Sequence, residues 1–228
     1  MLAKLFSLFF PRLCVVCGKS LIPAEKLLCL GCVSDLPRSG YWLREENIIT
    51  NLFRESQEIK IEHTSSFLYY TKESPYHQLL IRLKYKGETQ IGIELGRWFG
   101  AELKKAPLYQ TIEAIVPVPL HPKKERKRGY NQSRLFAEGI TSVTGWALET
   151  EVLLRTRHTP TQTRLNREER QKNVAGAFTL QKEARITGKH ILLVDDILTT
   201  GATLQTCVIE LLKAPECRVS VATVAYVE

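Results

Sequence analysis

The sequence predicts an α/β fold: an open, mostly parallel sheet covered by helices, preceded by a small four-cysteine module. Two observations carry this prediction. From residue 112 onward, apolar runs alternate with segments of helical periodicity, which is typical of a parallel sheet covered on both faces. Four cysteines stand ahead of this region in two Cys-x-x-Cys pairs. The 228 residues are enough for one sizeable core and one small module with its linker, which we place at 61–228 and 1–60.

The composition indicates a soluble globular protein with a basic surface. Hydrophobic residues make up 44%, the mean hydropathy is −0.14, and no apolar run approaches the roughly 20 residues of a membrane span. We therefore predict a cytoplasmic protein without stable membrane insertion. The net charge of +8 suits anionic partners, and polyphosphates and nucleic acids fit it equally well.

The first ten residues are apolar and are expected to form a short amphipathic helix packed on the body, which leaves room for transient membrane contact. A weak signal peptide is the alternative. Lys4 interrupts its apolar part and no small-residue cleavage site precedes Cys14, so the helix is favoured.

The cysteine spacing predicts a zinc site. Eleven residues separate the pair Cys14 and Cys17 from the pair Cys29 and Cys32, which is a strong tetrathiolate pattern. Four sulfur ligands leave no open coordination position, so a structural Zn²⁺ is predicted rather than a catalytic one. Two disulfides are the alternative, which a cytosolic location disfavours.

The elements follow one another in a simple order. The polar segment 44–60 lacks periodicity and is assigned to the linker. The core strands are expected at 112–119, 147–153, 175–180, 191–194 and 218–227, after a first strand at 67–70. Helices are expected from Pro75 through Leu83 and at 91–103, 132–143 and 204–212. Ligands of open parallel sheets bind at the carboxyl ends of the strands, which places the chemistry after residues 119, 153 and 194.

The stretch 194–203 is the most informative part of the chain. Asp195 and Asp196 follow a buried strand, and their carboxylates can accept from sugar hydroxyls and help to hold Mg²⁺. Small residues then open a helix, where free N–H groups and the helix dipole favour a phosphate. Hydroxyl donors and close backbone approach come from Thr199, Thr200, Gly201, Ala202 and Thr203. A phosphorylated, polyhydroxylated ligand is predicted; a strand end and capped helix without a ligand is the alternative.

Basic residues gather behind two of the predicted strands. Twelve of the 32 Lys and Arg residues lie in two windows, which are Lys123, Lys124, Arg126, Lys127, Arg128 and Arg134, then Arg155, Arg157, Arg164, Arg167, Arg170 and Lys172. We expect both windows to converge on the phosphate-type loop and to bind anions, with a solvated charged face as the alternative. The segment 155–173 is expected to act as a lid that excludes water; a plain disordered loop is the alternative.

The segment 194–203 closely resembles the 5-phosphoribosyl-1-pyrophosphate (PRPP) loop of type I phosphoribosyltransferases. The resemblance implies a sheet of that type, with Asp195 and Asp196 holding the ribose hydroxyls at the reacting centre and residues 199–203 holding the 5′-phosphate. The place of the family's pyrophosphate loop and lid is taken by Pro119, Leu120, Arg128, Arg164 and Arg167.

Four segments together resemble the ComF family, over nearly the whole chain. They are the Cys-x-x-Cys pairs, Leu83-Lys84-Tyr85-Lys86-Gly87, Pro117-Val118-Pro119-Leu120 with Arg128-Gly129-Tyr130-Asn131-Gln132, and the 194–203 loop. The resemblance implies handling of incoming single-stranded DNA during natural transformation, with DNA-uptake proteins as partners. The motifs do not encode an acceptor substrate.

Alternating cations and an aromatic ring suit base stacking beside a phosphate, so the candidate nucleic-acid contacts are Lys84, Tyr85, Lys86, Arg126 and Lys127. A helix end with a packed tyrosine is the alternative. We predict a ComF-type protein with Mg²⁺-dependent PRPP binding and phosphoribosyl transfer as its candidate activity. A non-catalytic single-stranded DNA-binding module with a ligand-responsive pocket is one alternative. A nucleobase-salvage phosphoribosyltransferase is the other, which the lack of an evident base-recognition segment disfavours.

Overall fold

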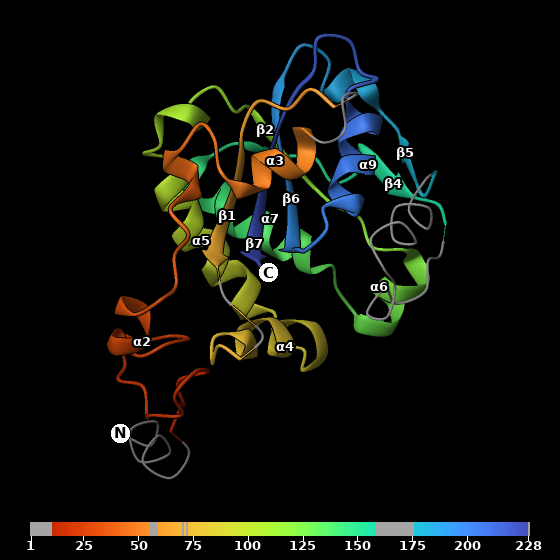
Figure 1. Ribbon diagram of the computed structural model, residues 1–228. Helices are drawn as coiled ribbons and strands as arrows, with labels where there is room; N and C mark the ends of the chain where they lie inside the picture. Colours follow the sequence, from red (N-terminus) through yellow and green to blue (C-terminus); the bar gives the residue numbers. More distant parts are fainter. Residues whose placement is uncertain (1–10, 55–58, 70, 72, 158–175, 228) are drawn as a thin grey trace.

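The computed structural model describes residues 11–54, 59–69, 71, 73–157 and 176–227 (Figure 1). Its centre is a five-stranded sheet in the order β1-β7-β6-β2-β3, in which all neighbouring strands run parallel. The strands are β1 Thr64–Tyr69, β2 Ala114–Pro117, β3 Ala147–Leu148, β6 His190–Leu198 and β7 Arg218–Tyr226. This arrangement confirms the predicted α/β fold with an open parallel sheet.

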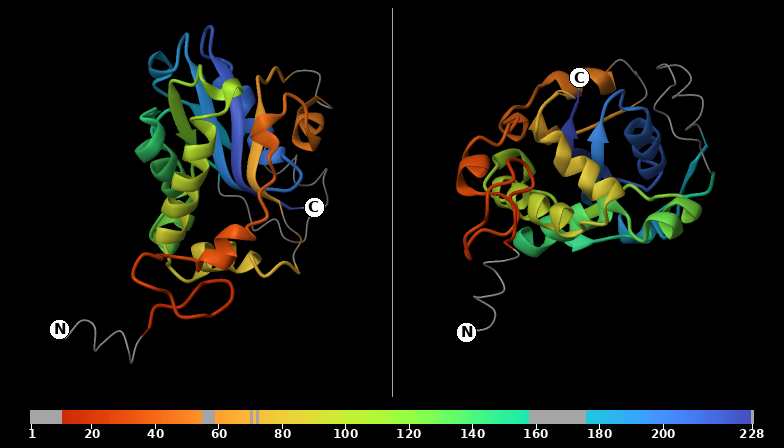
Figure 2. Two further views of the ribbon diagram at one scale, coloured as in Figure 1. Left: turned by 90° about the vertical axis from the view of Figure 1, so that its left-hand side faces the viewer. Right: turned by 90° about the horizontal axis from the view of Figure 1, so that it is seen from below.

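Helices cover both faces of this sheet (Figure 2). In β6, Leu192 and Val194 belong to the hydrophobic layer beneath α4, α5 and α7, whereas Ile191 and Leu193 belong to the layer beneath α3 and α9. The helices are α3 Ile48–Arg54, α4 His77–Tyr85, α5 Gln90–Leu103, α7 Gln132–Thr144 and α9 Ala202–Leu211. Because both faces are buried, the strand is apolar without alternation in the sequence.

The helices α5 and α7 pack backbone against backbone. A Cβ atom on Gly96 would collide with the Phe136 carbonyl oxygen, and one on Gly139 would collide with the Ile93 carbonyl oxygen. Glycine is therefore required at both positions. The contact fixes α7, whose first residues reach the candidate site.

Two of the strands predicted for the core lie elsewhere. The expected strand 147–153 is split, and the expected strand 175–180 pairs antiparallel with its second half, outside the main sheet. These two short strands are β4 Leu153–Arg155 and β5 Phe178–Leu180. A continuous strand would carry Glu149 and Glu151 into the sheet, whereas both carboxylates form ion pairs with Arg185. The cost of burying these charges explains why the chain leaves the sheet after Leu148.

A helix replaces part of the predicted linker 44–60. Ile49 and Phe53 of α3 are fully buried, and Gln205 in α9 donates from Nε2 to the Leu52 carbonyl oxygen at 2.6 Å. The apolar residues at 48, 49, 52 and 53 have helical spacing, but they span fewer than two turns, which is too short a pattern to separate a helix from a linker. Residues 48–54 pack on the α/β body, and the division of the chain at residue 60 stays a prediction.

The four-cysteine module lies beside α4 (Figure 1). Tyr76 donates from its hydroxyl to the Cys32 carbonyl oxygen at 3.0 Å, and Lys26 forms an ion pair with Glu94 of α5 at 3.3 Å. The remaining short elements are α2 Leu30–Ser34, η1 Tyr41–Leu43, η2 Pro107–Tyr109, α6 Pro122–Arg128 and η4 Glu183–Arg185. Within the described ranges, no helix is long and apolar enough to cross a membrane.

Candidate functional site

Two adjacent carboxylates lie near the carboxyl end of β6. We expected this strand to end at Val194, but its pairing with β7 continues to Leu198, so Asp195 and Asp196 lie inside the strand. The length of the neighbouring strand, and not the apolar run, determines where β6 ends. The acid pair is consequently held by a sheet rather than by a loop.

Hydrogen bonds and an ion pair fix the two carboxylates. Asp195 Oδ1 accepts from Ser133 Oγ at 2.7 Å and from the Asp196 N–H at 2.8 Å, and Asp196 Oδ2 lies 2.9 Å from Lys84 Nζ. Burial and the neighbouring Asp196 charge raise the pKa of Asp195 to about 7, against the opposing effects of Ser133 and Lys84. Asp195 is therefore close to a change of charge at neutral pH, and a bound cation would favour its ionised form.

A hollow follows the acid pair at the start of α9, lined by Asp195 and residues 197–204. Gly201 precedes the helix with a φ of 77°, a left-handed conformation that favours glycine. No side chain of this N-cap residue bonds to the first N–H groups of α9. The structure thus brings the predicted loop and Asp195 together around one hollow, at the N-terminus of a helix that can bind an anion.

The Arg128–Gln132 motif holds three parts of the site together. Tyr130 donates from its hydroxyl to the Leu83 carbonyl oxygen at 2.5 Å, which anchors the end of α4. Asn131 donates from Nδ2 to the Val118 carbonyl oxygen at 3.0 Å and caps α7 by accepting from the Ser133 N–H. Ser133 then reaches Asp195. Ser133 was not among the predicted site residues, because its contact with Asp195 spans 62 residues of the sequence.

A group of cations, of which Arg155 is buried and Lys124 and Arg128 are half-buried, lies beside the acid pair. Arg155 is 9% exposed, and its guanidinium lies 5.1 Å from the centre of the Phe178 ring. Burial lowers the pKa of Arg155, while the negative charge of Asp195 raises it. Burial also lowers the pKa of Lys124, and Arg155 and Arg128 lower it further. Arg155 of the second basic window and Lys124 and Arg128 of the first are thus within electrostatic range of one another, and the convergence of both windows on the phosphate-type loop stays a prediction.

The end of α4 reaches the same site. Lys84 pairs with Asp196, while Tyr85 is 72% exposed with the Arg128 guanidinium 5.8 Å from the centre of its ring. The alternative of a packed tyrosine is therefore wrong. Lys86 is exposed, as are Arg126 and Lys127 on α6. Sequence analysis placed Lys84 among the nucleic-acid contacts and did not foresee its contact with the acid pair.

The other predicted residues fall into two groups. Pro119 and Leu120 are half-buried in the segment that joins β2 to α6. Arg164 and Arg167, with residues 158–173 of the lid predicted at 155–173, lie outside the described residues, as does the predicted helix at 1–10. Their roles stay predictions.

The four cysteines of the module form one cluster. The sulfur atoms of Cys14, Cys17, Cys29 and Cys32 all lie within 4.8 Å of one another, and each thiol is free. The disulfide alternative is therefore wrong. Burial favours the neutral thiol of Cys14, but backbone hydrogen bonds outweigh it and lower the pKa to about 6. A ready thiolate among four convergent sulfurs fits a tetrahedral Zn²⁺ site.

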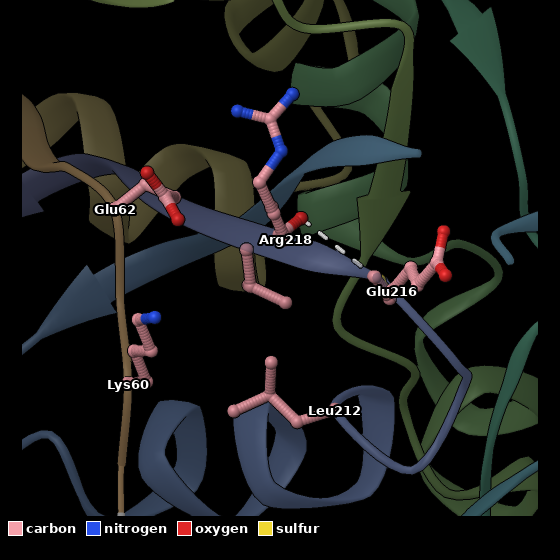
Figure 3. A pocket seen from close by; sticks show the side chains of 7 residues that line it. Lys60, Glu62, Leu212, Glu216 and Arg218 are labelled. Carbon is pink, nitrogen blue, oxygen red and sulfur yellow. Dashed lines mark hydrogen bonds between the residues drawn. The ribbon is translucent and has the colours of Figure 1, made fainter. Parts of the chain in front are cut away.

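A second hollow lies at the opposite end of the sheet, where β7 begins (Figure 3). Lys60, Glu62, Glu216 and Arg218 stand around it and Leu212 lies in its wall, so its charges balance. Open parallel sheets bind their ligands at the carboxyl ends of the strands. The acid pair and its hollow are therefore the candidate site.

Several known proteins resemble the chain. A model of the phosphoribosyl transferase domain matches residues 150–228. Competence protein F of Haemophilus influenzae is 28% identical over 208 residues, which cover 86% of this chain and 89% of that protein. DNA utilization protein YhgH of Salmonella typhimurium is 32% identical over 133 residues, and these cover 57% of this chain and only 58% of the relative.

Among solved structures, glutamine phosphoribosylpyrophosphate amidotransferase from B. subtilis is 18% identical with a TM-score of 0.43, over 63% of this chain and 30% of that chain.

Proposed function

The chain belongs to the ComF family, with a phosphoribosyltransferase-type fold, and on that premise we propose that it binds PRPP together with Mg²⁺ and acts in the uptake or use of DNA. One observation carries the proposal. The acid pair and the hollow at α9 lie at the carboxyl end of β6, and the buried Arg155 is within electrostatic range of Asp195. A sugar with a phosphate at one end and a pyrophosphate at the other needs three kinds of contact: an anion site for the phosphate, acceptors for the hydroxyls, and cations for the pyrophosphate.

Each part of PRPP has a proposed partner. The ribose hydroxyls donate to Asp195 and Asp196, and the 5′-phosphate accepts from the first N–H groups of α9 and from the hydroxyls of Thr199, Thr200 and Thr203. The pyrophosphate lies toward the cations Lys124, Arg128 and Arg155. The predicted pyrophosphate and lid residues Pro119, Leu120, Arg164 and Arg167 complete this side.

Mg²⁺ fits the site because carboxylate and hydroxyl oxygens are the ligands that it prefers. When bound, it would neutralise the negative charge of the pyrophosphate. Asp195 and Asp196 would hold it together with the ribose. Their carboxylates remain in place because Ser133 and the strand pairing of β6 position them.

Phosphoribosyl transfer is the activity that we propose for this geometry. The bond from ribose C1 to pyrophosphate breaks, its electron pair leaves with the pyrophosphate, and an acceptor's lone pair forms the new bond to C1. The carboxylates of Asp195 and Asp196 would stabilise positive charge at the ribose, and the cations beside the acid pair would stabilise the leaving group. Isotope exchange between pyrophosphate and PRPP, with and without candidate acceptors, tests this step separately from binding.

Single-stranded DNA binding is the second candidate function, and the exposed Tyr85–Arg128 stack favours it. Affinity should fall steeply with salt, because each neutralised phosphate releases counterions. Arg126→Ala with Lys127→Ala should weaken binding and flatten the salt dependence, whereas Lys213→Ala with Lys182→Ala, remote surface lysines, should not. DNA affinity that is undetectable at low salt would place the role in DNA uptake with a protein partner. No feature of the described residues favours nucleobase salvage.

We also propose a structural Zn²⁺ at the four-cysteine cluster. Metal analysis of the purified protein should find one Zn²⁺ per chain. Cys29→Ser with Cys32→Ser should release it and unfold the module while PRPP binding remains measurable. Protein purified without zinc and with these thiols oxidised would contradict the proposal.

A further inference from the structure

We propose that Lys84 is an internal counter-cation of the acid pair, which the divalent metal must displace from Asp196 before PRPP can bind. The inference rests on the proposed function, because it concerns the control of that same site. It assigns to Lys84 a role apart from nucleic-acid contact.

The geometry places Lys84 where a cation is needed. Its Nζ lies 2.9 Å from Asp196 Oδ2, and the two side chains are 21% and 16% exposed. An ion pair that is mostly shielded from water is screened far less than a surface pair, so its attraction persists at physiological salt.

Asp196 is the member of the pair that faces this cation. The Asp195 carboxylate already accepts hydrogen bonds from Ser133 and from the Asp196 N–H. Lys84 Nζ therefore lies on the side of Asp196 from which a metal ion would approach its carboxylate.

The helix α4 holds Lys84 in this position. Leu79, Leu80 and Leu83 bury one side of the helix, and the Leu83 carbonyl oxygen accepts from the Tyr130 hydroxyl. The backbone beside Lys84 is thus anchored at both the core and the Arg128–Gln132 motif. Only the flexible four-carbon stem of the lysine has to move when a metal ion arrives.

Competition follows from these contacts. A single positive charge on Lys84 is exchanged for the double charge of the metal ion at the same carboxylate. Part of the metal's binding free energy is spent on breaking the ion pair, so Lys84 raises the Mg²⁺ concentration at which PRPP binds. Removal of Lys84 should lower it.

The test is calorimetry of PRPP binding over a series of Mg²⁺ concentrations, in wild type and in Lys84→Met. Loss of a charge-assisted contact should lower the half-effective Mg²⁺ concentration by about tenfold. The PRPP affinity at saturating Mg²⁺ should stay within about threefold, because the exchange is then complete. Lys86→Met removes the same charge from an exposed position two residues away and should shift the midpoint less than about twofold.

Two further variants serve as controls, one for the charge of Lys84 and one for the stability of the fold. Lys84→Arg keeps the charge and should keep the wild-type midpoint within about threefold. Lys84→Gln replaces Lys84→Met if the latter unfolds at a lower temperature than wild type. Each variant's fold is checked by its thermal unfolding transition.

The outcomes separate the two proposals. Equal midpoints in Lys84→Met and Lys86→Met would overturn the counter-cation role. A loss of PRPP affinity at saturating Mg²⁺ would overturn it too, and would make Lys84 a direct ligand contact. If wild type binds no PRPP at any Mg²⁺ concentration, the proposed function fails instead. In that case, Mn²⁺ binding without PRPP is measured from the electron paramagnetic resonance signal of free Mn²⁺. This measurement tests whether Lys84→Met still binds the metal more tightly than Lys86→Met.

Discussion

The two ends of β6 carry polar groups that the fold treats in opposite ways. At the amino end, His190 is 1% exposed, with Nδ1 2.7 Å from Thr111 Oγ1 and Nε2 2.9 Å from Ser220 Oγ. At the carboxyl end, Asp195 and Asp196 bring two carboxylates together, and Lys84 forms an ion pair with Asp196. At the amino end, the buried polar side chain is hydrogen-bonded within the protein. At the carboxyl end, carboxylates are available to bind a ligand.

The titration of both ends follows from the same cause. Burial, with the charge of Arg218, lowers the pKa of His190 to about 4. Burial, with the charge of Asp196, raises the pKa of Asp195 to about 7. Both groups are thus driven toward their neutral forms, but only at the carboxyl end would a metal ion reverse the effect. The comparison teaches that a shifted pKa alone does not mark a functional site.

His190→Ala should give the largest effect on stability and none on the ligand. It leaves a cavity and removes one hydrogen-bond partner each from the Thr111 and Ser220 hydroxyls, so the free energy of unfolding should fall by about 2–4 kcal/mol. Urea denaturation measures this change. PRPP affinity at saturating Mg²⁺, measured on the folded variant, should match wild type, and a weaker affinity would break the distinction between the two ends.

Asp195→Asn with Asp196→Asn should have the reverse profile. Loss of charge-assisted bonds worth about 1.5–3 kcal/mol should weaken Mg²⁺-dependent PRPP binding at least tenfold. Stability should change little, because the removal of two adjacent like charges offsets the loss of the Lys84–Asp196 ion pair. Glu149→Gln with Glu151→Gln changes the net charge equally at the surface and should leave PRPP binding intact. Equal affinity in wild type and the Asn variant, by calorimetry, would mean that the acid pair is only structural.

The pH dependence of stability sharpens the comparison. Asp195 has a raised pKa in the folded state, so its contribution to stability is present below about pH 4 and is lost as the pH rises toward 7. His190 has a lowered pKa, so its contribution is present above about pH 6.5 and is lost as the pH falls toward 4. The two slopes oppose each other between pH 4 and 6.5.

Single variants should reveal each slope. Between pH 4 and 6.5, Asp195→Asn should make stability rise more steeply with pH, by at most about 1.4 kcal/mol per unit. His190→Gln should instead make it fall more steeply with pH. Urea denaturation across this range measures both, and identical slopes in the two variants would contradict the assignment.

Thr200→Val should give the smallest effect. It removes one hydroxyl from the proposed phosphate hollow, so PRPP should bind about two- to tenfold more weakly. The Mg²⁺ midpoint should stay unchanged, because Thr200 does not contact the acid pair's cation in the proposed complex. Thr206→Val on the same helix, whose hydroxyl bonds to the Ala202 carbonyl oxygen, is the control and should leave the affinity intact. A shifted midpoint in Thr200→Val would place the metal nearer to the loop.

Local motifs allowed much of this molecule to be predicted. The cysteine spacing and the 194–203 stretch each place their chemistry within a few residues, so they could be recognised without knowledge of the fold. The long apolar helices were equally evident. Such features depend on neighbours in the sequence, and the structure brings them together as expected.

The failures depend on contacts between distant residues. The end of β6 is set by its pairing with β7, which continues to Leu198. The exit of the chain from the sheet after Leu148 depends on the ion pairs that Glu149 and Glu151 form with Arg185. Lys84 and Asp196 come from different halves of the chain, and Ser133 and Asp195 are 62 residues apart. A single sequence carries no signal for such pairs.

Loss-of-function mutations in this protein should fall at two kinds of position: residues of the proposed ligand site and glycines of the α5–α7 contact. Gly96 and Gly139 touch through their backbones, and α7 then runs about 9 Å from Gly139 to Ser133, whose hydroxyl holds Asp195. A side chain at Gly139 would push α5 and α7 apart. Because α7 moves as a rigid helix, Ser133 would then be displaced from Asp195. Such an allele would copy the defect of a lost Asp195 in a genetic screen, although the glycine itself binds nothing.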